Sequence, residues 1–200
     1  MKKRSSMIRG LAAVLCCCIL CSAAFAGERV FPDVSEDADY YEAVEALVKV
    51  GIILGDDKGN FNPDQTLTRA EAAAILCRLV GKADRGEEVT ETPFDDVPVT
   101  HWAAGYIVTA VKEGLVDGYG NGRFGPGDEL SYEQIVTLLV RVLGYRDAAE
   151  HIGSWPEGYL LVAQRLGITE GVAQGNASRA TVCQMIFNVL KTDLLSREGN

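Results

Sequence analysis

Apolar residues recur along the chain at the three- and four-residue spacing of amphipathic helices, in short stretches separated by loops of glycine, aspartate, asparagine and proline. The first stretch covers residues 40–48 and stops at Gly51. After a polar loop over residues 55–63, a second stretch covers residues 72–79 and stops at Gly81. The pattern predicts a helix–loop–helix unit, because glycine just beyond an apolar stripe is a common helix stop.

The same unit occurs again further along the chain. When residues 31–81 are moved forward by 63 positions onto residues 94–144, 14 of 51 residues are identical without a gap, where average composition gives roughly three. Residues 145–192 contain a third, degenerate copy, in which Trp155 matches Trp102. This copy lacks the Phe-x-Asp-Val opening and the Gly-x-Phe-x-Pro loop, and it is six residues shorter before its second helix. The sequence therefore predicts three tandem repeats.

The second helix of each repeat begins with a capping signal. Thr68 with Glu71, and Ser131 with Gln134, have the spacing of a capping box, in which each side chain bonds a backbone N–H of the other residue. Ser178 is the equivalent cap in the third repeat. Two short helices cannot bury a sufficient core alone, so the repeats are expected to pack on one another as an all-α domain. The polar residues 82–93 are predicted to be a linker.

Residues 1–26 have the features of a secretory signal peptide. Positive residues at the start precede an apolar run over residues 11–20, and small residues follow up to Ala24-Phe25-Ala26. The apolar run is too short to span a bilayer, and no second long apolar segment follows, so no transmembrane segment is expected after cleavage. Four of the six cysteines lie in this leader, and Cys77 and Cys183 are predicted to be buried free thiols.

The formal charge is −9, and it becomes more negative without the basic leader. This balance argues against nucleic-acid binding, which depends on Lys and Arg neutralising phosphates. No nucleophile elbow, His-Glu-x-x-His or P-loop motif is present, so no enzyme activity, catalytic residue or cofactor is predicted. The acidic loop that begins at Asp56 does not fit a calcium loop, because Lys58 occupies its third position, and no metal is predicted. His101 and His151 are expected to be surface residues, the latter in a polar connector.

The spaced motifs resemble S-layer homology (SLH) repeats. The similarity covers residues 31–192, strongly in the first two repeats and weakly in the third. It rests on these residues: Phe31-x-Asp33-Val34, Gly51, Gly59-x-Phe61-x-Pro63 and Thr68-Arg69-Ala70-Glu71 in the first repeat, and Phe94-x-Asp96-Val97, Trp102-Ala103, Asp117-Gly118 and Phe124-x-Pro126 in the second.

The resemblance implies three repeats in a pseudo-threefold arrangement around a central helix bundle. It also implies a secreted protein at the cell wall or S-layer of a Gram-positive-type bacterium, attached without a covalent bond to a secondary cell-wall polymer, often a pyruvylated glycan. The arginine of the Thr-Arg-Ala-Glu motif is the best-known ligand contact of the family. The alternative is an envelope protein-interaction or structural scaffold that binds another envelope protein and no glycan.

Arg69 and Arg179 are the principal candidates for glycan binding. Each lies just inside a predicted helix N-terminus, where free N–H groups favour an anion and a guanidinium can bind a carboxylate with two hydrogen bonds. The alternative for Arg69 is a solvated side chain or a pair with Glu71. The second repeat has Tyr132 at this position, which argues against an anion site there.

Four further residues are candidates for the same site. Asp33 and Asp96 either contact sugar or bond backbone N–H groups in a turn, and the turn is favoured. Trp102 and Trp155 either stack on a sugar ring or lie buried between helices. We expect Arg69 to meet the Asp96/Trp102 edge of the second repeat, and Arg179 to meet the Asp33 edge of the first.

Overall fold

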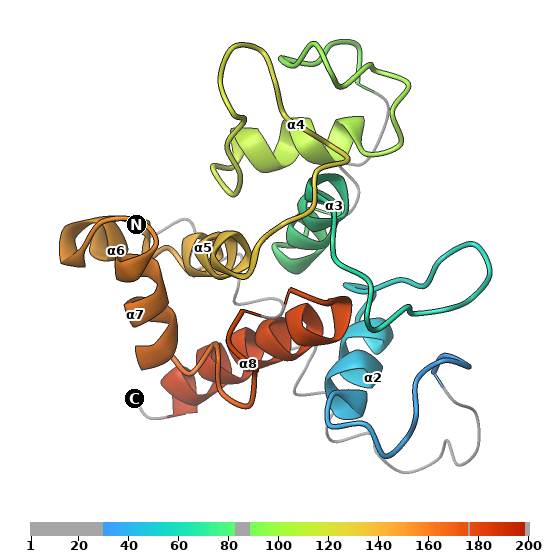
Figure 1. The fold of residues 1–200 in the computed structure, drawn as a ribbon, viewed down its shortest axis with the longest axis vertical. Coiled ribbons are helices and arrows are strands. Elements are labelled where there is room, and N and C mark those ends of the chain that lie inside the picture. Colours follow the sequence, from blue (N-terminus) through green and yellow to red (C-terminus); the bar gives the residue numbers. More distant parts are fainter. Residues whose placement is uncertain (1–29, 83–88, 176, 199–200) are drawn as a thin grey trace. The chain divides into compact units, whose positions relative to one another are not determined.

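The computed structural model describes residues 30–82, 89–175 and 177–198, with side chains up to residue 192 in the last stretch. The predicted signal peptide and half of the predicted linker, residues 83–88, lie outside the described residues. Seven α-helices form in the described part of the chain (Figure 1). They are α2 (Tyr41–Lys49), α3 (Arg69–Leu79), α4 (Ala104–Lys112), α5 (Tyr132–Val142), α6 (Arg146–Ile152), α7 (Glu157–Arg165) and α8 (Arg179–Glu198).

The fold is all-α, as predicted. Within the described ranges, extended pairing is confined to isolated bridges that involve single residues, such as Thr66 with Ser178 and Thr68 with Glu129. No helix among these residues is long and apolar enough to cross a bilayer.

The chain divides into two compact units whose boundaries do not follow the sequence repeats. The small unit is Leu67–Leu130, and the large unit is formed by the described residues on both sides of it, 30–66 and 131–198. The small unit therefore contains the second helix of the first repeat and the first helix of the second repeat.

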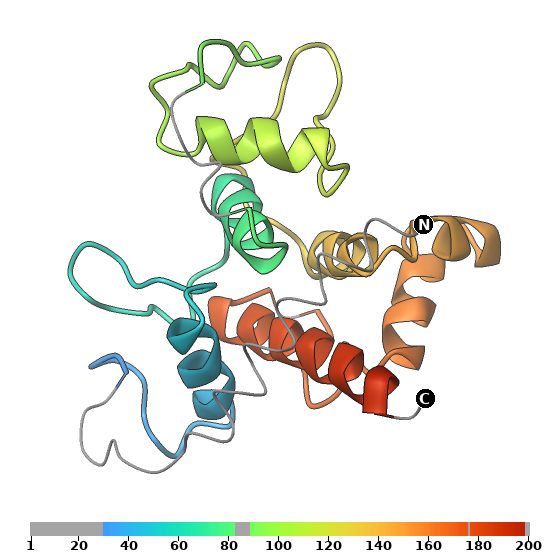
Figure 2. The same cartoon turned by 180° about the vertical axis from the view of Figure 1, so that it is seen from behind.

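In the small unit, α3 packs against α4, and both views of the fold show the two helices together (Figures 1 and 2). The apolar stripe of α3 is buried at Leu76 and Leu79, and that of α4 at Ile107 and Ala110. Burial of these side chains supplies the driving force for packing the two helices, because neither helix has a sufficient apolar face alone.

In the large unit, α5 packs against α7 and α2 packs against α8. The pairs α3–α4, α5–α7 and α2–α8 follow one rule: the second helix of one repeat packs on the first helix of the next, while α6 packs mainly on α7. The α8–α2 pair applies this rule from the third repeat to the first. The predicted pseudo-threefold arrangement of the whole domain stays a prediction.

Two phenylalanines fill the loops between the helices of the first two repeats. Phe61 is fully buried and Phe124 is 1% exposed. The ring of Phe31 stacks on Phe61 at a centroid distance of 5.7 Å. A Cβ atom at Gly55 would lie 2.6 Å from the Phe31 ring, so glycine is required at that position by the aromatic packing.

The expectation of a polar connector around His151 is wrong, because this segment is α6. Arg146 and Glu150 form an i,i+4 ion pair on this helix with an Nε–Oε1 distance of 3.0 Å. Glu150 also accepts a hydrogen bond from the Tyr159 hydroxyl, and Ala149 is buried. The ion pair within α6 and the hydrogen bond from Tyr159 of α7 together stabilise this short helix.

Cys77 and Cys183 are buried free thiols, as predicted. Burial is the main reason why the pKa of each thiol is raised to about 12. Both side chains therefore stay in the thiol form at neutral pH and act as small apolar core residues.

The capping box of α3 provides a test of helix stability. Thr68 Oγ1 accepts a hydrogen bond from the Glu71 N–H, and the Glu71 carboxylate accepts one from the Thr68 N–H. Replacing Thr68→Ala is expected to lower the free energy of unfolding by about 1 kcal/mol, because the helix loses its cap. Urea denaturation followed by circular dichroism measures this loss. The matched control is Thr90→Ala at an exposed position, and an equal effect of both changes would contradict the role of the cap.

Candidate ligand-binding site: two arginine clamps

Arg69, the first residue of α3, binds the loop of the second repeat within the small unit. Its Nε donates to the carbonyl of Phe124 at 2.8 Å, and its Nη2 donates to the carbonyl of Asp117, also at 2.8 Å. The guanidinium lies 4.4 Å from the ring centroid of Tyr119 and 4.6 Å from that of Phe124. The residue is 9% exposed. Arg69 is therefore buried at the boundary between the first and second repeats and is not a solvated side chain.

The first N–H groups of α3 bind the same loop. The Arg69 N–H donates to the carbonyl of Asp128 at 2.9 Å, and the Ala70 N–H donates to the carbonyl of Pro126 at 3.0 Å. The Glu71 N–H is taken by the cap. We expected these N–H groups to be open to an anion, and the structure corrects that argument, because loop carbonyls and the cap already satisfy them.

Asp96 fixes the loop from its other side. Its carboxylate accepts hydrogen bonds from the N–H groups of Phe124 and Gly125 at 2.9 and 2.7 Å. Phe124 is therefore bound at its N–H by Asp96 and at its carbonyl by Arg69. We call the set Asp96, Phe124 and Arg69 the first arginine clamp. Arg69 and Asp96 therefore meet at the same loop of the second repeat. Asp96 binds backbone N–H groups of this turn, which is the role favoured for it from the sequence.

The large unit contains an equivalent set, with every partner displaced by 63 positions. Arg179 Nε donates to the carbonyl of Phe61 at 2.7 Å, and Nη2 donates to that of Leu54 at 3.1 Å. Asp33 accepts hydrogen bonds from the N–H groups of Phe61 and Asn62 at 2.9 and 2.7 Å. We call Asp33, Phe61 and Arg179 the second arginine clamp. Arg179 is 8% exposed.

The second clamp also includes a capped helix start. The Arg179 N–H donates to the carbonyl of Gln65, and the Ala180 N–H donates to that of Pro63. Ser178 Oγ accepts a hydrogen bond from the Thr181 N–H at 3.3 Å, which places Ser178 at the cap position of α8.

Ser131 and Gln134 form the full capping box at the start of α5.

Burial and hydrogen bonding shift the pKa values of Arg69 and Asp96 in the first clamp. Desolvation lowers the pKa of the Arg69 guanidinium, while Tyr119 and nearby carboxylates, Asp128 first among them, act in the opposite direction. Partial burial raises the pKa of the Asp96 carboxyl, but the N–H donors of Phe124 and Gly125 outweigh it, so that this pKa lies below its usual value. Arg69 keeps its positive charge, because an arginine guanidinium is not deprotonated in proteins.

The two tryptophans lie at the surface and not between helices. Trp102 is 57% exposed and its ring stacks on that of His101. Trp155 is 55% exposed, and its indole N–H donates to the Thr137 hydroxyl at 3.0 Å. This corrects the burial alternative, because both residues are more than half exposed, although one face of the Trp102 ring is covered by His101.

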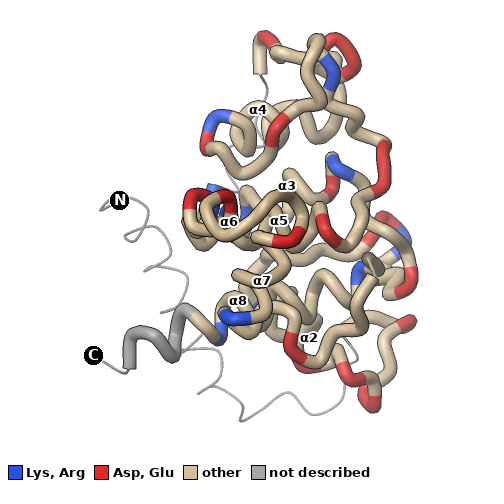
Figure 3. The backbone as a smooth tube through the Cα atoms, turned by 60° about the vertical axis from the view of Figure 1, so that its left-hand side comes forward, with Lys and Arg blue, Asp and Glu red and all other residues tan. Residues whose placement is uncertain are grey.

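Tyr132 takes the arginine position at the start of α5. It is 5% exposed, and the third repeat has no Phe-x-Pro loop to receive an arginine there. Acidic positions outnumber basic ones along the described backbone (Figure 3), in line with the negative net charge. Among the described residues, no group of three or more His, Cys, Asp and Glu side chains is arranged to hold a metal.

Comparison with known proteins identifies the repeats. The S-layer homology domain matches residues 30–73 and 93–136, which contain the Phe-x-Asp-Val openings, the phenylalanine loops and the starts of α3 and α5. The chain therefore belongs to the S-layer homology domain proteins.

The relatives are mostly large surface proteins. A "Cell surface protein" of Thermoanaerobacter kivui is 40% identical over 150 residues, which are 74% of this chain and 19% of that protein. A "Surface layer protein" of Brevibacillus choshinensis is 32% identical over 178 residues, which are 87% of this chain and 16% of that protein. An "Amylopullulanase" of Thermoanaerobacterium thermosulfurigenes is 33% identical over 122 residues, 60% of this chain and 6% of that protein. The chain thus spans less than a fifth of each of these relatives. Their names describe surface proteins and an enzyme, so similar segments occur in proteins of different function.

The clamp geometry predicts that lysine cannot replace Arg69. A single ammonium lacks the fork that reaches the carbonyls of Phe124 and Asp117 together, so Arg69→Lys is expected to lower the free energy of unfolding by about 2 kcal/mol. Urea denaturation measures the loss. Arg165→Lys, a change at an exposed arginine of α7, is the matched control and is expected to have little effect. Equal stability of the Arg69→Lys variant and the unchanged protein would contradict the clamp.

The lowered pKa of Asp96 predicts a pH-dependent contribution to stability. A carboxyl whose pKa is lower in the folded state stabilises the fold above its unfolded pKa, about 3.9, and this contribution is lost as the pH falls through the folded pKa. The cost of Asp96→Asn is therefore expected to be constant between pH 7 and about pH 5 and to shrink below about pH 4. Urea denaturation of both proteins across this range measures the difference. A cost that grows on acidification would contradict the assignment.

Proposed function

We propose that the chain is a cell-wall anchoring module, secreted to the surface of a Gram-positive-type bacterium, which holds an anionic secondary cell-wall polymer without a covalent bond. The observation that carries the proposal is the repeated clamp. In both units an arginine is fixed at the boundary between two repeats. Arg69 lies in a repeat that matches the S-layer homology domain, and Arg179 lies at the corresponding position of the predicted third repeat.

The hydrogen bonds of the clamps position each guanidinium without neutralising it. Backbone carbonyls carry no net charge, so the bonds to Phe124 and Phe61 fix the direction of each guanidinium while the positive charge remains. A fixed, partly desolvated cation attracts a carboxylate or phosphate more strongly than a flexible surface lysine does. A pyruvylated glycan supplies such a carboxylate.

The negative net charge of the protein constrains how such a polymer binds. Long-range electrostatics repels an anionic chain from a protein of charge −9, so that recognition depends on local contacts. The exposed indole of Trp102 lies in the same unit as Arg69, and that of Trp155 lies in the same unit as Arg179. Stacking of a sugar ring on each indole adds apolar contact to the charge interaction at the clamps.

The names of the relatives support a location at the cell surface and an anchoring role. They include surface-layer and cell-surface proteins, and also an enzyme to which such a module is joined. We infer no catalytic role for the described repeats. The predicted leader supports export.

Co-sedimentation with purified wall sacculi tests the proposal. The protein is expected to sediment with native sacculi and to stay in solution after the secondary polymer has been extracted. Arg69→Gln combined with Arg179→Gln is expected to weaken retention by at least about tenfold, because each arginine contributes a charged hydrogen bond to the ligand. Circular dichroism verifies that the double variant is folded.

Arg165→Gln is the matched control at an exposed arginine and is expected to keep full retention. Retention that survives polymer extraction would overturn the glycan proposal in favour of a protein-interaction scaffold. Loss of binding in the control to the same extent as in the double variant would show a general effect of charge and not a role of the clamps.

A further inference from the structure

A tight turn in the small unit carries the dipeptide Asn121-Gly122, which occurs once in the sequence. The two residues link Gly120 and Arg123, which form an isolated antiparallel bridge. Asn121 has a φ of 50° and Gly122 a φ of 74°. Two consecutive positive φ values are typical of the type I′ hairpin turn, for which Asn-Gly is a preferred sequence.

This turn joins the two chain segments that bind Arg69. The carbonyl of Asp117 before the turn accepts from Nη2, and that of Phe124 after the turn accepts from Nε, both at 2.8 Å. The Tyr119 N–H donates to the Arg123 carbonyl at 2.8 Å and pairs the two segments. The spacing of the two acceptors of Arg69 therefore depends on the length of the turn.

Asn121 has the features of an asparagine that deamidates. Its side chain is exposed. Within the part of the chain that the structure describes, the Gly122 N–H donates no hydrogen bond. Glycine also adds no side chain that would shield its nitrogen. The Gly122 nitrogen is thus available to attack the carboxamide carbon of Asn121.

The other asparagines that the structure describes lack this combination. The N–H that follows Asn60 donates to Asp33 at 2.9 Å, and the residue that follows Asn62 is a proline, which has no N–H. Asn188 lies within α8, and its carboxamide donates to two backbone carbonyls. The structure therefore singles out Asn121 among these asparagines.

The fold itself maintains the reactive pair. A positive φ disfavours most residue types other than asparagine, aspartate and glycine at position 121. A Cβ atom at Gly122 would lie 2.5 Å from Oδ2 of Asp95, so glycine is required next to it. The equivalent pair in the first repeat is Lys58-Gly59, so the second clamp has no asparagine at this place.

We propose that Asn121 is a deamidation site and that its conversion loosens the first arginine clamp. The Gly122 nitrogen forms a bond to the side-chain carbonyl carbon of Asn121, the bond from that carbon to Nδ2 breaks, and the Gly122 proton passes through solvent to the departing nitrogen. Ammonia leaves and a cyclic succinimide remains. Water then opens the ring at either of its carbonyl carbons.

The two ways of opening the ring have different consequences for the clamp. Hydrolysis of the bond between the Gly122 nitrogen and the side-chain carbonyl carbon gives aspartate, which leaves the main chain unchanged. Hydrolysis at the main-chain carbonyl carbon gives isoaspartate, whose main chain is longer by one carbon atom. A two-residue turn fixes the register of the segments that it joins, so the added atom displaces Phe124 relative to Asp117. Arg69 then loses the geometry in which it binds both carbonyls.

Incubation of the full chain at mildly alkaline pH, followed by peptide mapping with mass spectrometry, tests the modification. Asn121 is expected to convert at least about tenfold faster than Asn60 or Asn188, because glycine leaves the attacking nitrogen unshielded. The rate is expected to increase with pH, since the attacking nitrogen must lose its proton. Labelling with an isoaspartate methyltransferase distinguishes isoaspartate from aspartate.

¹H–¹⁵N NMR of the same samples tests the effect on the clamp. The Nε–H signals of Arg69 and Arg179 report the hydrogen bonds to the carbonyls of Phe124 and Phe61. The Arg69 signal of the folded clamp is expected to lose intensity in proportion to the isoaspartate formed. The Arg179 signal is expected to stay constant and is the internal control.

Two variants separate the added atom from the added charge. Asn121→Gly keeps a residue that adopts a positive φ and removes the carboxamide, so its Arg69 signal is expected to persist throughout the incubation. Asn121→Asp has the charge of the products with an unchanged main chain, and before incubation it is expected to show the same Arg69 signal as the unchanged protein.

Three results would overturn the inference. The first is conversion of Asn121 no faster than that of Asn60. The second is an unchanged Arg69 signal in protein that contains isoaspartate. The third is an equal loss of the Arg69 signal in the Asn121→Gly variant, which would place the cause of the loss elsewhere in the chain. Retention on sacculi does not enter this test, so its outcome is independent of the anchoring function.

Discussion

A buried guanidinium needs hydrogen-bond acceptors, since an unpaired buried charge is strongly destabilising. Arg69 and Arg179 satisfy this need with main-chain carbonyls of the repeat that follows in cyclic order. The acceptors are uncharged, so each arginine joins two repeats and keeps its cationic character. The helix pairs α3–α4 and α8–α2 and the loops around Phe124 and Phe61 are all tied to these two side chains.

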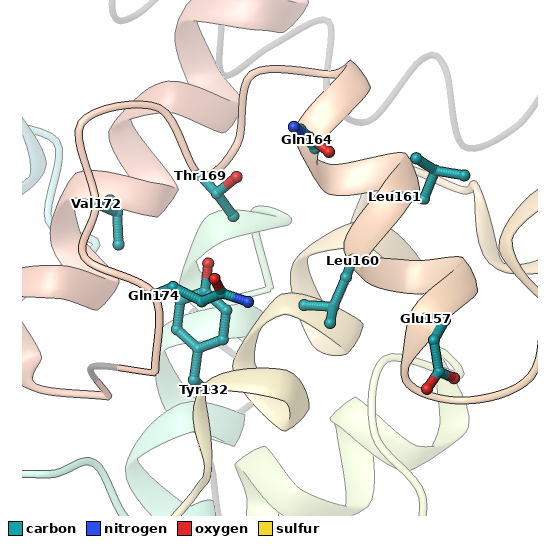
Figure 4. A pocket seen from close by; sticks show the side chains of 8 residues that line it. All are labelled: Tyr132, Glu157, Leu160, Leu161, Gln164, Thr169, Val172 and Gln174. Carbon is teal, nitrogen blue, oxygen red and sulfur yellow. The ribbon is translucent and has the colours of Figure 1, made fainter.

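This constraint explains why the third repeat and residue 132 differ from the pattern together. An arginine is present where the receiving repeat has its phenylalanine loop, as at positions 69 and 179. Where the receiving loop is shortened, the chain has Tyr132, which meets its hydrogen-bonding need with one hydroxyl. The two departures therefore appear as matched changes on either side of one boundary, with a pocket of about 380 Å³ between them that is lined by Tyr132, Leu160 and Gln174 among others (Figure 4).

Much of this fold is predictable from the sequence because it depends on local chemistry. The caps at Thr68 and Ser131, the apolar stripes and the buried loop residues Phe61 and Phe124 all follow from spacing and residue type. The helix α6 does not, because part of its stability comes from contact with Tyr159 on the next helix.

The clamps could be predicted only in part. The sequence pattern predicts that Arg69 lies beside Asp96. The hydrogen-bond acceptors of Arg69 are backbone carbonyls as many as 55 positions away. Every residue has a backbone carbonyl, so the sequence does not indicate which ones the arginine binds. The exposure of Trp102 and Trp155 was equally open, since an indole suits both an interior and a rim. A departure from the family pattern, such as Tyr132, is a signal that a different local environment should be sought.

The boundaries at Leu67 and Leu130 have an evolutionary consequence, because the segment that is copied in the gene and the segment that packs are out of phase by half a repeat. A newly duplicated repeat would arrive with an arginine whose acceptors reside in its neighbour. Such a chain can gain or lose repeats only if both neighbours of the insertion remain able to receive that side chain, which favours a conserved number of copies over free expansion.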